Sequence, residues 1–281
     1  MEILREPHPS LNLLLTIDVG NTNCTFGLFD GEKITHQWRI QSNRIKTSDE
    51  YGIELEMILN HFCYDRTDIK DVIIGSVVPD LIHRFSAMSK RFLHIDPMVV
   101  GDNTKTGVPL RLDNPKEVGA DRIVNVVSGF EFYGGPLIII DIGTAITHDV
   151  ISERGEYLGG SIAPGIGIAS EALFMKTAKL PKIELVYPKS GIGHNTVEAM
   201  QTGIVLGFIG LIDRITEQII KEVQESEGKR PRVIATGGYS SLIAFNSAYV
   251  EKVDKDLTLH GLRLIYERTM KARKLEGERK A

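Results

Sequence analysis

The strongest constraint on the fold is a motif that the chain contains twice, as "IDVGNTN" and as "IDIGTAIT". In each copy an apolar run ends at an aspartate, Asp18 or Asp141, and a cluster of small polar residues separates it from a second apolar run. Apolar runs bounded by such turn residues are typical of β-strands. The copies lie near the start and near the middle of the chain, so the period is too long for a solenoid. The repeat therefore predicts two lobes of similar topology.

The length of the chain agrees with two lobes, because 281 residues are more than one hydrophobic core of ordinary size holds. The stretch "YGGP", residues 133–136, separates the two halves of the pattern. We therefore expect an N-terminal lobe over residues 1–133 and a C-terminal lobe over residues 134–281, which ends in a charged tail. The sequence assigns no role to residues 1–10.

Strands and helices alternate in both halves, which predicts an α/β fold. The first half contains three consecutive strands with a hairpin turn at Asp30-Gly31, a helix that we expect Ser48 to cap, the strand "DVIIGSVV", and two further helices. The second half contains three strands within residues 136–164, a helix after them, a long helix that starts near Asn195, the strand "RVIATGG" and a C-terminal helix.

Composition excludes several classes of protein. A net charge of −4 and the lack of a basic helix argue against a nucleic-acid-binding protein. The longest apolar stretches, such as "GIVLGFIGLI", are too short to span a membrane. Two cysteines, Cys24 and Cys63, cannot form a disulfide framework or a zinc site, so we expect a reducing cytoplasm and two small, buried side chains.

The residues after each aspartate are suited to phosphates and metal ions. A carboxylate at a strand end can hold a hydrated Mg²⁺, and a glycine beside it lets the backbone approach a phosphate closely. Main-chain amides, hydroxyls and side-chain amides in such a turn can donate hydrogen bonds to phosphate oxygens. An ordinary hairpin turn is the alternative, and for one motif alone it is the preferred interpretation. The residues concerned are Asp18, Gly20, Asn21, Thr22 and Asn23 in the first motif, and Asp141, Gly143, Thr144 and Thr147 in the second.

A third glycine-containing strand end, "RVIATGGYS", places Gly237 and Gly238 between a strand and a helix. Glycines at such a junction permit close approach to the sugar or base of a nucleotide. Three strand ends of this kind, in this order, are difficult to explain as turns alone.

The motifs together resemble the type III pantothenate kinases of the acetate and sugar kinase/Hsc70/actin superfamily. The resemblance runs from about Leu13 to about Tyr266 and rests on "DVGNTN", "NPKEVGADR", "DIGTAIT", "GGSIAPG", "TAKLP", "GHNTVEAMQTG" and "ATGGYS". It implies two RNase H-like (actin-like ATPase) lobes, a cytoplasmic homodimer, and phosphorylation of pantothenate by ATP as the first step of coenzyme A synthesis. The implied cofactors are Mg²⁺ and a monovalent cation, K⁺ or NH₄⁺.

The resemblance also implies roles for individual residues. Asp121 of "GADR" matches the general base, Arg122 would pair with the substrate carboxylate, and Gly119 would leave room for the substrate. The alternative for Asp121 and Arg122 is a solvated ion pair on a helix. Thr196 matches a substrate-side threonine, although it could simply cap its helix. Asp18 and Asp141 would hold Mg²⁺. The phosphate contacts would come from Gly20, Asn21, Thr22, Asn23, Gly143 and Thr144; Asn21 could also touch pantothenate, and Gly237 and Gly238 would face the adenosine.

Three positions depart from the family pattern. Ile146 replaces a threonine of the second motif, and His148 stands where an apolar or aromatic residue is frequent. Leu112 occupies the position of a tyrosine that lines the pantothenate pocket in many members. We expect a modest effect from Ile146 and a packing role for His148.

Other functions remain open at the level of the sequence. A superfamily kinase or phosphatase with another acceptor would share the aspartate motifs but not "NPKEVGADR" or "TAKLP". A non-catalytic accessory protein that modulates transcription, or a nucleotide-binding scaffold, would need no base, whereas Asp18, Asp121 and Asp141 are all present.

Overall fold

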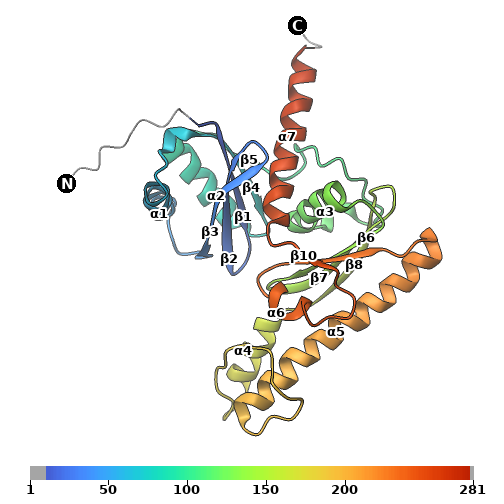
Figure 1. Cartoon of the computed structure of the whole chain (residues 1–281). Helices are drawn as coiled ribbons and strands as arrows, with labels where there is room; N and C mark the ends of the chain where they lie inside the picture. The colour runs from blue at the N-terminus through green and yellow to red at the C-terminus, as the bar shows by residue number, and fades with distance from the viewer. Residues whose placement is uncertain (1–10, 279–281) are drawn as a thin grey trace. The chain divides into compact units, whose positions relative to one another are not determined.

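The computed structural model describes residues 11–278, which contain two five-stranded mixed sheets flanked by helices (Figure 1). The strand order is β3-β2-β1-β4-β5 in the first sheet and β10-β9-β6-β7-β8 in the second. Numbered within its own sheet, each follows the order 3-2-1-4-5. The predicted repeat of topology is confirmed.

The first sheet is built from β1 (Leu13–Val19), β2 (Asn23–Asp30), β3 (Lys33–Gln41), β4 (Ile69–Ser76) and β5 (Met98–Val99). β1 lies between β2, with which it is antiparallel, and β4, with which it is parallel. The predicted hairpin between β2 and β3 is present, with Gly31 at φ +58° in the turn between the paired residues Asp30 and Lys33.

Helices α1 (Ser48–His61) and α2 (Pro79–Met88) cover one face of the first sheet. Their buried side chains, among them Leu55, Leu81 and Phe85, pack on the β1, β2 and β4 residues of one core. α1 begins at Ser48, but its N-cap is Thr47, whose hydroxyl accepts from the Glu50 amide while the Glu50 carboxylate accepts from the Thr47 amide. The cap therefore lies one residue before the predicted Ser48, because Thr47 and Glu50 have the spacing of a capping box.

The C-terminal helix α7 (Leu257–Glu278) packs with the first sheet from Thr258 onward, whereas its first residue, Leu257, belongs to the core of the second. A Cβ at Gly75 of β4 would lie 2.8 Å from Leu262, and one at Gly27 of β2 would lie 3.0 Å from Leu259. By contacts, the first compact unit consists of the described residues up to Gly107, Gly119–Val124, and those from Thr258 onward. The second consists of Val108–Val118 and Asn125–Leu257. The chain thus passes between the units several times. The expected boundary near residues 133–136, which divides the two copies of the sequence motif, stays a prediction.

The second sheet is built from β6 (Leu137–Ile142), β7 (Ala145–Ile151), β8 (Tyr157–Pro164), β9 (Arg232–Thr236) and β10 (Lys252–Val253). α5 (Thr196–Glu227) and α6 (Ser240–Ala244) cover one face, with Ile140, Ile142, Ile146 and Val233 in the shared core. α3 (Ala120–Tyr133) contributes Val126 to the core on the opposite face, which contains Ile139, Ile151 and Tyr157. α4 (Ile166–Lys176) follows β8.

The charged C-terminal tail is helical in the structure as far as Glu278, and residues 1–10 and 279–281 lie outside the described residues. Within the described part, no helix is both long and apolar enough to traverse a bilayer. Cys24 is buried as predicted, whereas Cys63 is exposed. The prediction for Cys63 was wrong because this residue follows the last turn of α1 at φ +63°, outside the core.

The departure His148 lies in β7 and is fully buried, as expected for a packing role. Its Nδ1 is 2.9 Å from the Ser161 hydroxyl on β8, and its Nε2 is 3.2 Å from the Thr216 hydroxyl on α5. The imidazole therefore joins the second sheet to α5 through hydrogen bonds to two hydroxyl groups.

We predict that Thr216→Val, which keeps the side-chain shape, lowers the free energy of unfolding by about 1–3 kcal/mol, because it removes a hydroxyl partner from a buried imidazole. Urea unfolding of the variant and the wild type measures the difference. Thr202→Val, also on α5 but only half-buried, is the control with a smaller expected loss. Equal effects of the two substitutions would contradict a specific role for the His148 contact.

Candidate active site

The first motif forms a tip between β1 and β2, with Asp18 in the next-to-last position of β1. The Gly20 amide donates to the Asn23 carbonyl over 3.1 Å and closes the turn, while Asn21, Thr22 and Asn23 are exposed. The carboxylate is half-buried at the strand end and the polar side chains stand at the surface. The tip can therefore receive an anionic ligand from solvent.

Ser42, which follows β3, supports this tip in a way that the sequence analysis did not predict. Its amide donates to the Thr22 carbonyl over 2.9 Å, and its hydroxyl donates to the Gly20 carbonyl over 2.7 Å. The same hydroxyl is 3.2 Å from Sγ of Cys24. Burial raises the pKa of the Cys24 thiol to about 11, so the thiol is neutral and serves packing.

The "GADR" segment lies at the same end of the first sheet as this tip. Val77, just after β4, donates its amide to the Val19 carbonyl over 3.4 Å, and a Cβ at Gly119 would lie 3.6 Å from a Val77 methyl group. The start of α3, which carries Asp121, is thereby packed beside the end of β1.

Asp121 stands in the first turn of α3 and is half-buried. Burial raises the pKa of its carboxyl group. Two features of Arg122 oppose that rise: its amide donates to Asp121 Oδ1 over 2.8 Å, and its side chain carries a positive charge. A carboxylate with a raised pKa is a better proton acceptor than a fully solvated one. A Cβ at Gly119 would lie 2.4 Å from Asp121 Oδ1, so Gly119 makes room for this carboxylate itself.

The second motif forms the corresponding tip between β6 and β7. Asp141 again occupies the next-to-last position of its strand, and it lies opposite Thr147 in the register, as Asp18 lies opposite Thr25. The Gly143 amide donates to the Ala145 carbonyl over 3.0 Å, and Thr144 is exposed. The two tips therefore present the same chemistry on equivalent strands of their own sheets.

Two of the departures from the family pattern, Ile146 and Leu112, are accounted for by packing. Ile146 is fully buried in the core between the second sheet and α5, so its side chain points away from the solvent face of the tip. Leu112 packs on β8, where a Cβ at Gly159 would lie 3.3 Å from it. The Thr147 hydroxyl donates to Asp149 Oδ2 over 3.2 Å and so points toward a buried carboxylate.

Glycine residues from other elements surround the second tip. Gly237, at φ +94°, follows β9, and a Cβ there would lie 2.4 Å from Asp141 Oδ1. The Tyr239 amide donates to the Ile142 carbonyl over 3.0 Å, which fixes the β9–α6 junction against the tip, and Gly238 is exposed there. Gly165, the N-cap of α4, donates its amide to the Thr144 carbonyl over 3.1 Å. The second motif and the third glycine-containing strand end are thus brought together.

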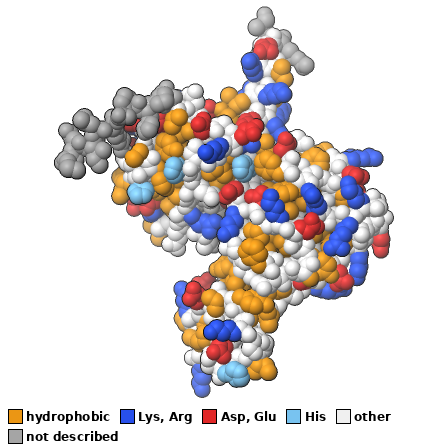
Figure 2. Space-filling view, in the orientation of Figure 1, with side chains coloured by type: hydrophobic (Ala, Val, Ile, Leu, Met, Phe, Trp, Pro, Cys, Tyr) orange, Lys and Arg blue, Asp and Glu red, His pale blue; other side chains and the backbone are white. Residues whose placement is uncertain are grey.

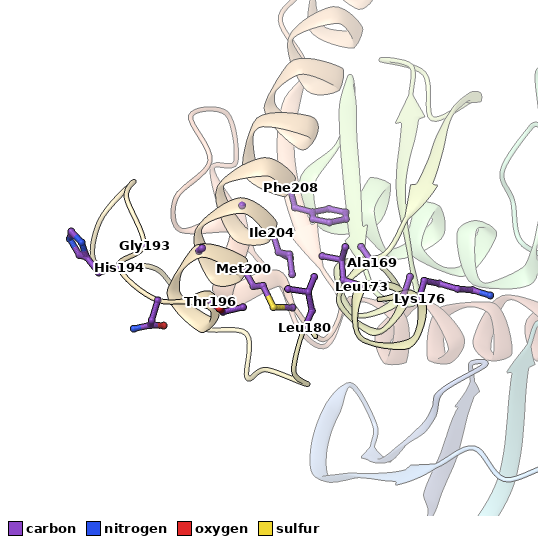
Figure 3. A pocket seen from close by; sticks show the side chains of 14 residues that line it. Ala169, Leu173, Lys176, Leu180, Gly193, His194, Thr196, Met200, Ile204 and Phe208 are labelled. Atoms are coloured by element: carbon purple, nitrogen blue, oxygen red, sulfur yellow. The ribbon is translucent and has the colours of Figure 1, made fainter. Parts of the chain in front are cut away.

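Thr196 is the first residue of α5, where it lines a groove of about 1080 Å³ between α4 and α5 (Figure 3). The N-cap of α5 is Asn195, whose side chain accepts from the Glu198 amide, so the Thr196 hydroxyl does not serve as the cap. Leu173, Leu180, Met200, Ile204 and Phe208 make the groove apolar, and Lys176 adds a positive charge at one side.

The metal-binding capacity of the described residues is limited. They contain no cluster of three or more His, Cys, Asp or Glu side chains able to hold a metal ion. Each tip instead offers one strand-end carboxylate beside amide and hydroxyl donors. This set fits a Mg²⁺ ion that keeps its waters and is shared with phosphates, and it does not fit an all-protein metal cage.

Solved structures similar to this one define the class of fold. A Baf family transcriptional activator, described as putative, from Campylobacter jejuni aligns over 90% of this chain and 97% of its own, with a TM-score of 0.55 and 19% identity. The activator of the 2-hydroxyisocaproyl-CoA dehydratase from Clostridium difficile aligns over 95% and 97%, with a TM-score of 0.50 and 13% identity. With the two related sheets, these likenesses confirm the actin-like ATPase fold.

Sequence comparison identifies the family within that class. The family model for type III pantothenate kinase matches residues 14–218. The type III pantothenate kinase of Finegoldia magna is 51% identical over 90% of this chain and 97% of that protein. The corresponding proteins of Citrifermentans bemidjiense and Geobacillus kaustophilus are 50% and 48% identical, over 91% of this chain and 99% and 98% of their own length. The chain belongs to the type III pantothenate kinase family.

We predict that Gly237→Ala weakens nucleotide binding by at least tenfold, because the new methyl group collides with the Asp141 carboxylate and the residue must keep a positive φ. Titration with a fluorescent ADP analogue measures the effect. Gly101→Ala is the control, since a Cβ there meets no atom within 4 Å. Unchanged affinity in Gly237→Ala would show that nucleotides do not use this side of the second tip.

Proposed function

We propose that this chain transfers the γ-phosphoryl group of ATP to pantothenate, giving ADP and 4′-phosphopantothenate, the first step of coenzyme A biosynthesis. The observation that carries the proposal is family membership, with about half of the residues identical to curated type III pantothenate kinases over nearly the whole chain. The half-buried carboxyl group of Asp121 supports it independently, because phosphoryl transfer to an alcohol needs a group that orients the hydroxyl and takes its proton.

In the proposed reaction the pantothenate hydroxyl oxygen attacks the γ-phosphorus, and the bond from that phosphorus to the ADP oxygen breaks. Asp121 accepts the hydroxyl proton, and Arg122 pairs with the pantothenate carboxylate through its guanidinium group. Gly119 keeps the space that the Asp121 carboxylate occupies. Asn21 contributes a further contact to pantothenate, and Thr196 contributes one from the groove between α4 and α5.

The phosphate chain of ATP is assigned to the two tips. Gly20, Asn21, Thr22 and Asn23 on the first, and Gly143 and Thr144 on the second, supply amide and hydroxyl donors. The N-terminus of α4, which begins at the second tip, adds a favourable dipole for an anion. Gly237 and Gly238 face the adenosine.

Asp18 and Asp141 are assigned as the carboxylates that hold Mg²⁺, directly or through water. The metal ion, when bound, neutralises charge that develops on the phosphates. A monovalent cation, K⁺ or NH₄⁺, completes the proposed requirements. We place the reaction in the cytoplasm.

The decisive experiment is a coupled ADP-release assay with ATP, Mg²⁺ and pantothenate, with and without K⁺ or NH₄⁺. The proposal expects ADP release that depends on pantothenate and rises with the monovalent cation. ADP release that ignores pantothenate but responds to another alcohol would identify a different kinase of the same fold. Binding of ATP with no release in the presence of pantothenate would indicate a non-catalytic relative.

We predict that Asp121→Asn lowers kcat by at least 100-fold while nucleotide affinity stays within about threefold of the wild type. The wild-type kcat/KM should fall as the pH drops through the raised pKa of Asp121, because protonation removes the acceptor; the variant should lack this acidic limb. Asp113→Asn, which changes an exposed aspartate before α3, is the control. An unchanged acidic limb in Asp121→Asn would exclude Asp121 as the base.

We also propose that the chain forms a homodimer through the arm made of α4 and the first half of α5, which projects from the second sheet (Figure 1). Large apolar side chains gather on this arm (Figure 2). Those at least one-third exposed on it or on the loop between its helices are Ile168, Leu173, Phe174, Met175, Val186, Tyr187, Ile192, Val197 and Leu206. A concentration of exposed apolar side chains is typical of protein interfaces. Gly203, Gly207 and Gly210 leave open space along α5 where a partner helix could approach closely.

We predict that Leu206→Asp converts the dimer to a monomer, because a carboxylate buried in an apolar interface is strongly unfavourable. Light scattering at working concentration measures the mass. Leu275→Asp, which charges an exposed leucine on α7, should remain dimeric. A wild-type protein that is monomeric under the same conditions would contradict the proposed dimer.

A further inference from the structure

Asn125 of α3 is a buried polar residue next to the second tip, and neither its sequence context nor the resemblance assigns it a role. Its side chain is 1% exposed, and its Nδ2 donates to Asp141 Oδ2 over 3.2 Å. Both residues belong to the second compact unit. The contact therefore reaches one oxygen of a carboxylate that the proposed function assigns to a cation.

The other oxygen of the same carboxylate faces the β9–α6 junction. Gly237 lies so close to Asp141 Oδ1 that a Cβ would be 2.4 Å from it. The carboxylate is thus held between an amide donor at Oδ2 and glycine backbone beside Oδ1, and its rotation about χ2 is restricted. The opposing strand residue, Thr147, donates its hydroxyl to Asp149.

Packing alone does not require an asparagine at position 125. The neighbouring residues Val124, Val126 and Val127 are at most 1% exposed, and an apolar side chain would suit such surroundings. A buried amide costs free energy unless its hydrogen bonds are made, so an asparagine is tolerated here because it has partners such as Asp141. Hydrogen-bond donors such as this side-chain amide orient the carboxylates that ligate metal ions in proteins.

We propose that Asn125 is a positioning residue that fixes the orientation of the Asp141 carboxylate for the cation bound with the nucleotide. The inference rests on the proposed function, since it needs Asp141 to ligate a cation. The cation is either the divalent ion that accompanies ATP or the monovalent ion, and the carboxylate–cation chemistry is the same for both.

The test compares Asn125→Ala with a matched control on the same helix, Ser128→Ala. Ser128 is also fully buried, and its hydroxyl donates to the Asn125 carbonyl over 3.2 Å. Ser128→Ala therefore removes a buried hydrogen bond but leaves the Asn125 side-chain amide that donates to Asp141. Mn²⁺ binding in the presence of ADP, followed by electron paramagnetic resonance of free Mn²⁺, measures the divalent ion. The K⁺-dependent rise in Tm with ADP bound, and the half-saturating K⁺ concentration for ADP release, measure the monovalent ion.

We expect both substitutions to lower Tm, and we expect only Asn125→Ala to raise the dissociation constant of Mn²⁺ or the half-saturating K⁺ concentration, by about 10- to 100-fold. Which of the two rises identifies the cation. If Asn125→Ala does not fold, Asn125→Leu, which keeps the side-chain volume and removes the donor without adding a charge, makes the same comparison. If Asn125→Ala binds both cations within twofold of the affinities of Ser128→Ala, the inference is overturned and Asn125 has a structural role only.

A wild type that binds Mn²⁺ and ADP but does not phosphorylate pantothenate would overturn the proposed acceptor and leave this inference standing.

Discussion

The positions of Asp18 and Asp141 depend on the pairing of one central strand in each sheet. β1 is hydrogen-bonded to β2 on one side and to β4 on the other, and β6 is paired in the same way with β7 and β9. A strand held on both sides cannot slip by one residue without turning its apolar side chains out of the core. The residue before the strand end is therefore fixed in place, and in both sheets that residue is an aspartate followed by a glycine turn.

Local patterns predicted these strands and tips well, because both signals lie within a few consecutive residues. The apolar runs of β1 and β6 and the glycines after them were sufficient to place Asp18 and Asp141 at strand ends. Even the correction at α1 is local: Thr47 and Glu50 form the capping box one residue before the predicted cap. The resemblance to the family then suggested the role proposed for Asp121, because the spacing alone does not distinguish it from a surface ion pair.

The supporting contacts could not be predicted, because they join residues far apart in the sequence. Ser42 reaches the Gly20 carbonyl across 22 positions, Asn125 reaches Asp141 across 16, and Gly237 approaches the same carboxylate from another strand. A buried polar residue within an apolar helix face was the available signal for Asn125. The same applies to α7, whose packing on the first sheet through Leu259 and Leu262 depends on two glycines in β2 and β4.

The departures Ile146 and His148 lie in the core beneath the second tip and not on its exposed surface. Alternation along β7 sends Ile146 and His148 to the side of α5 and sends Thr147 and Asp149 to the opposite face. Ile146 and His148 can therefore vary with the packing of α5, whereas the exposed Thr144 and the backbone of Gly143 keep the chemistry of the tip. A substitution on the α5 side changes stability first, and one on the Asp141 side changes the orientation of the carboxylate on which cation binding is proposed to depend.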